Sequence, residues 1–332
     1  MWAKTQYYFF LVFIFIASFL LFKCKSIASV NIFSIKEIPF PADNELTKDK
    51  IELGRKLFFD KRLSINETVS CATCHIPQFA FSDQKNVSEG VLGRKTERNS
   101  PSILNSAFLK TVLYDAFLPT LEMQVIVPIQ EHVEMDMSML ELIKRLKAIE
   151  EYQLAARKIF NHDFDPWVLT RSIASFERSL ISNNSRFDQF YYQKNKNALT
   201  KSEKAGWKLF SEKLYCTKCH PAPCFTTFLP DKNGIFKEED KDKGRFRVTE
   251  DSLDIGSFKI PSLRNVELTF PYMHNGSLNT IEEVIVHYSK GGKDKNYSNQ
   301  IIRPFKLNSS DINNLKLFLY SLTDTSYMKD FH

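Results

Sequence analysis

Two cysteine–histidine motifs carry the clearest chemistry in this sequence. Both have the spacing Cys-x-x-Cys-His, at Cys71-Ala72-Thr73-Cys74-His75 and Cys216-Thr217-Lys218-Cys219-His220. The two sulfurs of such a motif can form thioether bonds to the vinyl groups of one haem, and the adjacent histidine then supplies the proximal ligand of the iron. A structural zinc site requires four ligands, and a thioredoxin-like site requires an α/β context that this chain lacks. The motifs therefore predict two covalently bound haem c groups.

The function of two such haems depends on the sixth coordination position of each iron. An iron whose sixth position is closed passes electrons, whereas an iron with an open position can bind peroxide. The motifs alone therefore leave electron transport and catalysis both open.

Helical patterns surround both motifs and must position them. Asp165 is a candidate helix cap with a proline after it, and Thr200 followed by Glu203 has the pattern of a capping box. Strand patterns are few, so the fold class is expected to be mainly α. Apolar residues at helical spacing predict helices over 49–59, 139–149, 166–182, 199–210 and 309–322.

A weak internal repeat indicates two related units. The string Gly-Arg-Lys-Leu-Phe-Phe-Asp precedes Cys71, and Gly-Trp-Lys-Leu-Phe-Ser-Glu precedes Cys216. A helix followed by Cys-x-x-Cys-His is the expected start of a small cytochrome c domain. We therefore expect two cytochrome c-like domains, each with one c-type haem, over 33–195 and 196–332. Their boundary is expected in the polar stretch 182–197.

Residues 1–28 have the features of an export signal. A lysine is followed by an apolar run over 7–22, and Ser26-Ile27-Ala28 fits the pattern for cleavage after the alanine. An uncleaved N-terminal membrane anchor or a lipid on Cys24 is the alternative, and each of these places the folded part in the periplasm. Cys224 is then left unpaired and is expected to be a small buried residue. The net charge of +6 comes without a long basic run, so nothing indicates nucleic-acid binding.

Further strings lie in a fixed order around the motifs. They are Arg98-Asn99-Ser100-Pro101-Ser102, Leu121-Glu122-Met123-Gln124, Pro128-Ile129, Glu134-Met135, 176–182, 254–265 and 271–277. With these strings the chain resembles the bacterial di-haem cytochrome c peroxidase family, including its MauG branch, over residues 35–325.

The resemblance makes the haem of Cys71, Cys74 and His75 the peroxidatic one. It implies that Glu134 is the distal acid–base residue, with Gln124 beside it and Pro128 shaping the pocket. One carboxylate can move a proton from one peroxide oxygen to the other before the O–O bond breaks. Many family members carry a histidine in the loop after this motif that closes the iron in the resting state. Residues 76–97 contain neither histidine nor methionine, so the first haem is expected to be open without prior reduction.

For the second haem, held by Cys216, Cys219 and His220, the distal ligand has two candidates. The resemblance places it at Tyr288, where peroxidases usually have methionine and the MauG branch has tyrosine. Met273 is the alternative, because cytochromes c commonly use methionine. A thioether favours ferrous iron, whereas a phenolate favours higher oxidation states.

The resemblance also implies a calcium ion between the haems. Its protein ligands would be the side-chain oxygen of Asn99 and the main-chain oxygens of Thr269 and Pro271, a donor set that suits a hard cation. His274 would lie near this junction and a haem propionate. Tyr114 occupies the inter-haem position where the family usually has tryptophan, and would relay electrons between the haems.

Three functions follow as alternatives. The first is a cytochrome c peroxidase-like oxidoreductase that reduces hydrogen peroxide with electrons from a small redox protein, a cytochrome c or a copper protein, by way of the second haem. The second is a MauG-like enzyme that uses peroxide-derived high-valent iron to oxidise a protein or organic substrate. The third is a non-enzymatic electron carrier, which Glu134 and an open first haem disfavour.

Overall fold

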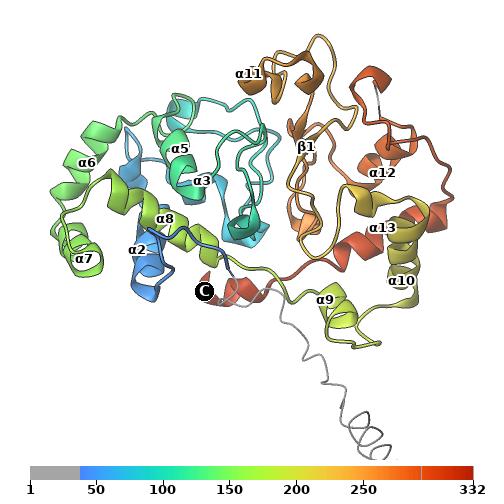
Figure 1. Cartoon of the computed structure of the whole chain (residues 1–332), viewed down its shortest axis with the longest axis horizontal. Helices are drawn as coiled ribbons and strands as arrows, with labels where there is room; N and C mark the ends of the chain where they lie inside the picture. The colour runs from blue at the N-terminus through green and yellow to red at the C-terminus, as the bar shows by residue number, and fades with distance from the viewer. Residues whose placement is uncertain (1–37, 293, 332) are drawn as a thin grey trace, which may run out of the picture. The chain divides into compact units, whose positions relative to one another are not determined.

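The computed structural model describes residues 38–292 and 294–331, and these are mainly helical (Figure 1). The predicted export signal lies outside the described residues. No helix within them is long and apolar enough to cross a membrane. The α-helices are α2 (Lys48–Phe59), α3 (Cys71–Cys74), α4 (Leu121–Gln124), α5 (Ile126–Gln130), α6 (Met139–Lys147), α7 (Glu150–Phe160), α8 (Pro166–Ser179), α9 (Arg186–Tyr191), α10 (Lys201–Lys208), α11 (Phe246–Thr249), α12 (Ile281–Ser289) and α13 (Ser309–Tyr320).

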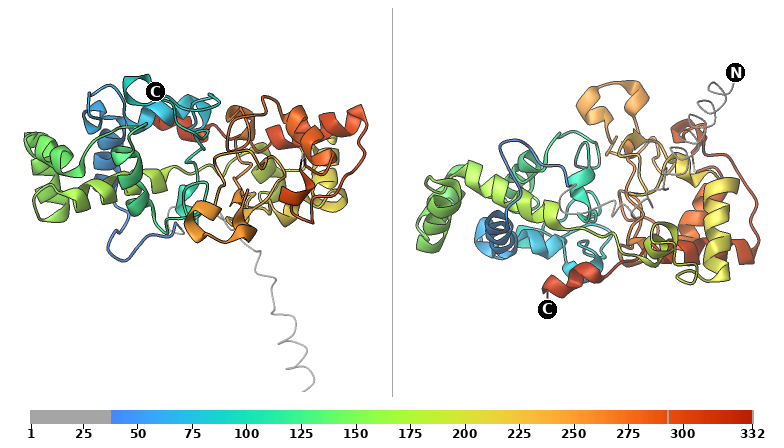
Figure 2. Two further views of the ribbon diagram at one scale, coloured as in Figure 1. Left: turned by 90° about the horizontal axis from the view of Figure 1, so that it is seen from above. Right: turned by 60° about the horizontal axis from the view of Figure 1, so that its bottom comes forward.

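Two closely packed helix pairs, α2 with α8 and α10 with α13, form the framework (Figures 1 and 2). Each crossing depends on a glycine of the repeat seen in the sequence. A Cβ atom on Gly54 would lie 1.9 Å from the carbonyl oxygen of Ser172, and one on Gly206 would lie 2.0 Å from that of Asn314. Since real Cβ atoms do not approach oxygen so closely, only glycine allows these helices to pack backbone to backbone.

Each helix pair belongs to its own cluster of buried residues. Leu57, Phe58 and Phe176 lie in the first cluster, and Phe210 and Phe318 lie in the second. The described residues nevertheless form one compact unit, so the division into two domains stays a prediction.

The last helical turn, η11 (Ser326–Phe331), packs on the first cluster rather than on the second. Its Tyr327 donates a hydrogen bond to the carbonyl oxygen of Pro77 (3.1 Å), and the ring of Phe331 contacts that of Phe81. Helix η11 therefore connects the segment after α13 to the first cluster.

The structure reveals a longer internal repeat, in which 98–130 corresponds to 258–290. Asn105 and Asn265 each adopt left-handed backbone angles (φ 60° and 58°) immediately before a 3₁₀-helix. Thr120 and Thr280 then cap α4 and α12 at matching positions. The same backbone path is therefore used twice, once beside each motif.

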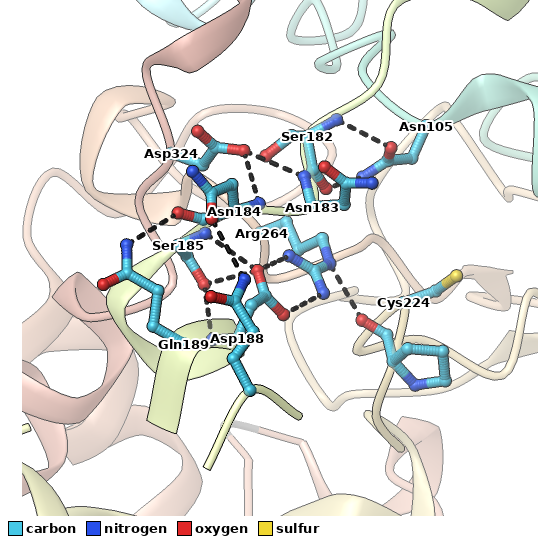
Figure 3. A network of polar contacts seen from close by, with 12 residues as sticks. Asn105, Ser182, Asn183, Asn184, Ser185, Asp188, Gln189, Cys224, Arg264 and Asp324 are labelled. Carbon is cyan, nitrogen blue, oxygen red and sulfur yellow. Dashed lines mark hydrogen bonds and ion pairs between the residues drawn. The ribbon is translucent and has the colours of Figure 1, made fainter. Parts of the chain in front are cut away.

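The two repeats meet at Ser182, within a polar network between the helix pairs (Figure 3). Asn105 donates from Nδ2 to the carbonyl oxygen of Ser182 (2.9 Å), and Asn265 donates to its hydroxyl oxygen (2.9 Å). Nearby, α9 lies within the stretch predicted as a boundary. Its Asp188 accepts two hydrogen bonds from Arg264, at 2.8 and 2.7 Å, and both side chains are buried. This stretch is therefore an ordered, specific connection.

We expect Arg264→Met to lower the free energy of unfolding by about 3–5 kcal/mol, because it leaves the Asp188 carboxylate buried without its partner. Urea denaturation followed by circular dichroism measures the change. The double variant with Asp188→Leu should regain part of the loss, since no lone charge then remains. A cost below about 1 kcal/mol for the single variant would contradict a buried pair of this kind.

The only regular sheet among the described residues is short. Strand β1 (Pro230–Asp231) pairs antiparallel with β2 (Phe258–Lys259), with Pro230 opposite Lys259. A sheet this short agrees with the small number of strand patterns in the sequence.

Candidate haem sites

The first motif forms a single helical turn, α3, that presents two thiols and a histidine together. His75 follows the turn, and its backbone N–H donates to the carbonyl oxygen of Cys71 (3.0 Å). The His75 Nδ1 atom lies 2.9 Å from the carbonyl oxygen of Phe81. Because a carbonyl only accepts hydrogen bonds, Nδ1 carries the proton and Nε2 keeps its lone pair for a metal. Burial lowers the pKa of His75, which also keeps the ring neutral.

The second motif repeats this arrangement with different residues. It contains the 3₁₀-helix η7 (Cys216–Lys218), followed by Cys219 and His220. The His220 Nδ1 atom lies 3.0 Å from the carbonyl oxygen of Phe225, and burial lowers the pKa of His220 to about 4. Its Nε2 atom is therefore also available as a ligand.

The loops that carry these two carbonyl groups are fixed by repeat-related serines. Ser102 donates to the carbonyl oxygen of Ala80 (2.6 Å), the residue before Phe81. Ser262 donates to that of Cys224 (2.7 Å), the residue before Phe225. Each repeat thus orients the histidine of its own motif.

This donor set fits a c-type haem in both places. Two neighbouring cysteines and a neutral, oriented imidazole are the groups that a covalent haem requires. None of the five described cysteines forms a disulfide, and Cys224 is buried as predicted. Burial raises the pKa of the Cys216 thiol to about 12 and that of Cys74 to about 11, so these thiols stay protonated.

Glu134 lies near enough to the first motif to affect it electrostatically. Burial raises the pKa of the Cys71 thiol, and the carboxylates of Glu177 and Glu134 are among the groups that raise it further. Burial likewise raises the pKa of Glu134 to about 7, with a smaller contribution from Glu131. A carboxyl group with this pKa can both accept and donate a proton near neutral pH.

The backbone around Glu134 is held from two sides. Its carbonyl oxygen accepts from the N–H of Val91 (2.8 Å), and the following residue, Met135, donates to the carbonyl oxygen of Pro128 (3.1 Å). A Cβ atom on Gly90 would lie 2.2 Å from the carbonyl oxygen of Val133, so only glycine permits this close approach. Glu134 is therefore fixed between the loop at Gly90 and helix α5.

Gln124 and Pro128 lie on the short helices α4 and α5, which lead directly to Glu134. Helix α4 is anchored by a buried ion pair in which Arg178 of α8 donates two hydrogen bonds to Glu122, at 2.5 and 2.8 Å. The three predicted distal residues thus belong to one segment, 121–134, on a fixed support.

Both candidate ligands of the second haem lie around Asn233. The Asn233 Nδ2 atom donates to the sulfur of Met273 (3.3 Å), and a side-chain hydrogen bond joins Asn233 to Tyr288. Burial raises the pKa of Tyr288 to about 12, and Cys219 and Cys216 add to this shift, which places the phenol beside the second motif. Met273 and Tyr288 therefore both stay candidates, and Asn233 hydrogen-bonds both of them.

The predicted calcium ligands come from both halves of the chain. Asn99 donates from Nδ2 to the carbonyl oxygen of Lys85 (2.7 Å), which leaves its Oδ1 atom as the acceptor. The backbone N–H of Asn99 donates to the carbonyl oxygen of His274 (2.8 Å). Thr269 and Pro271 lie shortly before His274 in the sequence.

The two predicted junction residues, His274 and Tyr114, are both placed between the halves. The His274 ring stacks on Phe258, with centroids 3.6 Å apart, and burial lowers its pKa to about 4. The Tyr114 carbonyl oxygen accepts from the N–H of Lys259 (2.6 Å), and burial raises the pKa of its phenol. Residues from both repeats therefore meet at one junction.

Sequence reasoning missed three features of these sites. The carbonyl groups of Phe81 and Phe225 leave no mark in the sequence, because any residue supplies a carbonyl. Asn233 lies in a polar loop without a motif. Lys259 could have been found by aligning 98–130 with 258–290, since Pro101-Ser102 matches Pro261-Ser262.

Comparison with known proteins gives one consistent result. The family model described as di-haem cytochrome c peroxidase matches residues 48–197. The cytochrome-c peroxidase IdrP1 of Pseudomonas sp. (strain SCT) is 32% identical, over 86% of this chain and 84% of that protein. The methylamine utilization protein MauG of Methylorubrum extorquens is 34% identical, over 86% of this chain and 82% of that protein.

Solved structures show the same fold. A MauG-like protein associated with microbial copper homeostasis is 32% identical, with a TM-score of 0.82 over 87% of this chain and 93% of that chain. The dihaem peroxidase BthA of Burkholderia thailandensis is 22% identical with a TM-score of 0.74, a likeness of fold alone.

Proposed function

Because this chain belongs to the di-haem cytochrome c peroxidase family, we propose that it binds two haem c groups and reduces hydrogen peroxide at the one above His75. The reaction consumes one peroxide, two protons and two electrons and releases two water molecules. A small redox protein, a cytochrome c or a copper protein, supplies the electrons. Cys71, Cys74 and His75 hold the first haem, and Cys216, Cys219 and His220 hold the second.

The residues of the first pocket handle the protons of this reaction. When bound, the first haem supplies the iron at which the O–O bond is broken, and the second supplies an electron store. The ionised Glu134 carboxylate accepts a proton from one peroxide oxygen and returns it to the other oxygen, which then leaves as water. Gln124, on the same segment, can orient the peroxide by hydrogen bonding.

One observation carries this proposal: Pro128 and Tyr288 occupy corresponding positions of the two repeats. Tyr288 on α12 has a phenol oxygen that lies close enough to Cys216 and Cys219 for both to raise its pKa. The Pro128 side chain on α5 has no atom that can bind iron. This difference supports the proposal that the second haem would have a tyrosine ligand and the first an open position, which is the asymmetry that a peroxidase needs.

We expect kcat/KM for peroxide to rise with pH and to be half-maximal near pH 7, because burial raises the pKa of Glu134 to about 7. Only the ionised carboxylate can accept a proton, so the rate falls below this pH and levels off above it. Stopped-flow rates between pH 5 and 9 measure the profile. A profile that is flat across this range would remove Glu134 as the base.

We propose Tyr288 rather than Met273 as the distal ligand of the second haem. Tyr288→Phe is then expected to convert this haem from low-spin to high-spin, because the ligand oxygen is lost, whereas Met273→Leu should leave it low-spin. Electron paramagnetic resonance of the two oxidised variants separates the candidates. The opposite pattern would assign the iron to Met273.

The second candidate function is MauG-like oxidation of a protein or organic substrate, and the choice of Tyr288 favours it. A phenolate supports higher oxidation states better than a thioether does. Steady consumption of peroxide with reduced cytochrome c or a copper protein would support the peroxidase. Rapid reaction with peroxide but negligible turnover with these donors would support the alternative.

Three further features are part of the proposal. A calcium ion would bind Asn99 Oδ1 and the carbonyl oxygens of Thr269 and Pro271, and Tyr114 would relay electrons between the haems. The two cytochrome c-like domains would span 33–195 and 196–332, with Phe187 of the first packing in the second cluster and Tyr327 of the second packing in the first. Residues 1–28 would direct export to the periplasm or anchor the protein to the membrane.

A further inference from the structure

The junction between the repeats contains two matching backbone contacts. The N–H of Asn99 donates to the carbonyl oxygen of His274 (2.8 Å), and the N–H of Lys259 donates to that of Tyr114 (2.6 Å). In the repeat, Asn99 corresponds to Lys259 and Tyr114 corresponds to His274. Each half therefore reaches across to the other through the same positions, so the junction has an approximate two-fold relation.

The side chains at these matching positions differ in charge. On one side, Asn99 has a neutral amide whose Oδ1 atom can bind a cation. On the other side, Lys259 introduces a cation of its own. The residue before it in β2, Phe258, stacks on His274 and lies below the guanidinium of Arg98, 5.6 Å from its centre. Since neighbouring strand residues point to opposite faces, the Lys259 side chain projects away from this stack.

The Lys259 side chain is half-buried and its amine is not paired. Within residues 38–292 and 294–331, its Nζ atom takes part in no hydrogen bond or ion pair. Burial alone lowers its pKa to about 8, with no carboxylate offsetting the effect. The side chain keeps some accessible surface, as do those of His75, His220 and Tyr288, the proposed haem ligands.

The other cations of the junction are paired with carboxylates. Arg98 donates to Asp242 at 2.6 and 2.8 Å, and Arg247 donates to Asp115 at 2.5 Å. Because an ammonium group that is largely removed from water and has no counter-ion is costly, Lys259 is expected to meet an anion that the polypeptide itself does not provide.

We propose that Lys259 binds a propionate carboxylate of a haem at the junction. The proposal rests on the haem attachment proposed above. Each haem c carries two carboxylates, and an ammonium beside one of them forms a strong, charge-assisted hydrogen bond. Lys259 would thus supply a fixed positive charge on one side of the junction, opposite the proposed calcium site at Asn99.

The test compares the reduction potentials of both haems in Lys259→Met, Lys259→Arg and the wild type. Losing the positive charge disfavours reduction, so Lys259→Met should lower the equilibrium constant for reduction of one haem about tenfold, which is 59 mV for one electron. Lys259→Arg keeps the charge and should stay close to the wild type. Lys243→Met, which removes an exposed lysine on the neighbouring loop, is the matched control and should change neither potential.

Spectroelectrochemical titration measures the reduction potential of each haem separately. The haem whose potential changes in the variant is the one whose propionate Lys259 binds. Unchanged potentials at both haems in Lys259→Met, with two haems bound, would overturn the proposal. If Lys259→Met does not accumulate, Lys259→Gln is titrated in its place, with the same expected shift and the same overturning result. Mass spectrometry counts the attached haems, so a wild-type chain without haem would instead refute the proposed function.

Discussion

Glu134→Gln is expected to slow the reaction of the oxidised protein with hydrogen peroxide by about 10²–10⁴-fold. Glutamine has nearly the same size and can still hydrogen-bond, but it cannot accept a proton at neutral pH. The structure holds the Glu134 backbone through Val91 on one side and through Met135 and Pro128 on the other, so the substitution should change the chemistry and not the position.

Stopped-flow absorbance of the haem bands after mixing with peroxide measures this rate. Glu131→Gln is the matched control, because Glu131 is exposed, its side chain affects Glu134 by raising its pKa, and the substitution keeps the backbone carbonyl that accepts the Glu134 N–H. It should leave the maximal rate unchanged and shift the pH profile slightly toward lower pH. A Glu134→Gln rate within about threefold of the wild type would remove this carboxyl group from the mechanism.

Pro128→Tyr is expected to close the first haem. The repeat places Pro128 where the second half has Tyr288, so a tyrosine at this position has the same backbone path toward the iron. The variant should lose cyanide binding by more than about 10-fold in affinity, or 1.4 kcal/mol, and should react with peroxide correspondingly slowly.

Pro128→Ala is the control for this variant, because alanine suits a helix and offers no ligand atom. It should keep an open, high-spin first haem. If Pro128→Tyr also stays high-spin and binds cyanide like the wild type, then correspondence of the two repeats does not determine which iron is closed.

The helices beside the motifs could be predicted because their signals are local. Thr200 and Glu203 form the expected capping box, Asp165 caps α8, and α2 and α13 begin within a residue of the predicted positions. The predicted C-terminal ends of the helices were less accurate than their starts. The predicted helix over 166–182 ends at Ser179, because the chain turns there to meet Asn105 and Asn265.

Two helices were missed. The sequence analysis did not predict α12, which carries Tyr288, although Thr280 and Glu283 form a capping box at its start, the same local signal that identified the helix after Thr200. Helix α9 lies where a boundary was expected, since Asp188 is held by Arg264, a residue distant in the sequence. Such long-range pairs cannot be read from local spacing.

The candidate site also combines features that the sequence predicts with features that only the structure shows. The two motifs and Glu134 follow from sequence strings and the resemblance, and in the structure the Glu134 carboxylate lies near enough to raise the pKa of the Cys71 thiol. The neutral state of His75 and His220, the role of Gly90 and the unpaired charge of Lys259 required coordinates. Each of these depends on backbone carbonyls or on burial, and neither is encoded by a residue's own type.

The most direct test of the open first haem is cyanide titration of the oxidised protein, followed by electron paramagnetic resonance. We predict one high-spin and one low-spin haem before cyanide, and binding of one cyanide per chain that converts the high-spin signal to low-spin without any prior reduction. Two low-spin haems that ignore cyanide until the protein is reduced would contradict an open iron above His75.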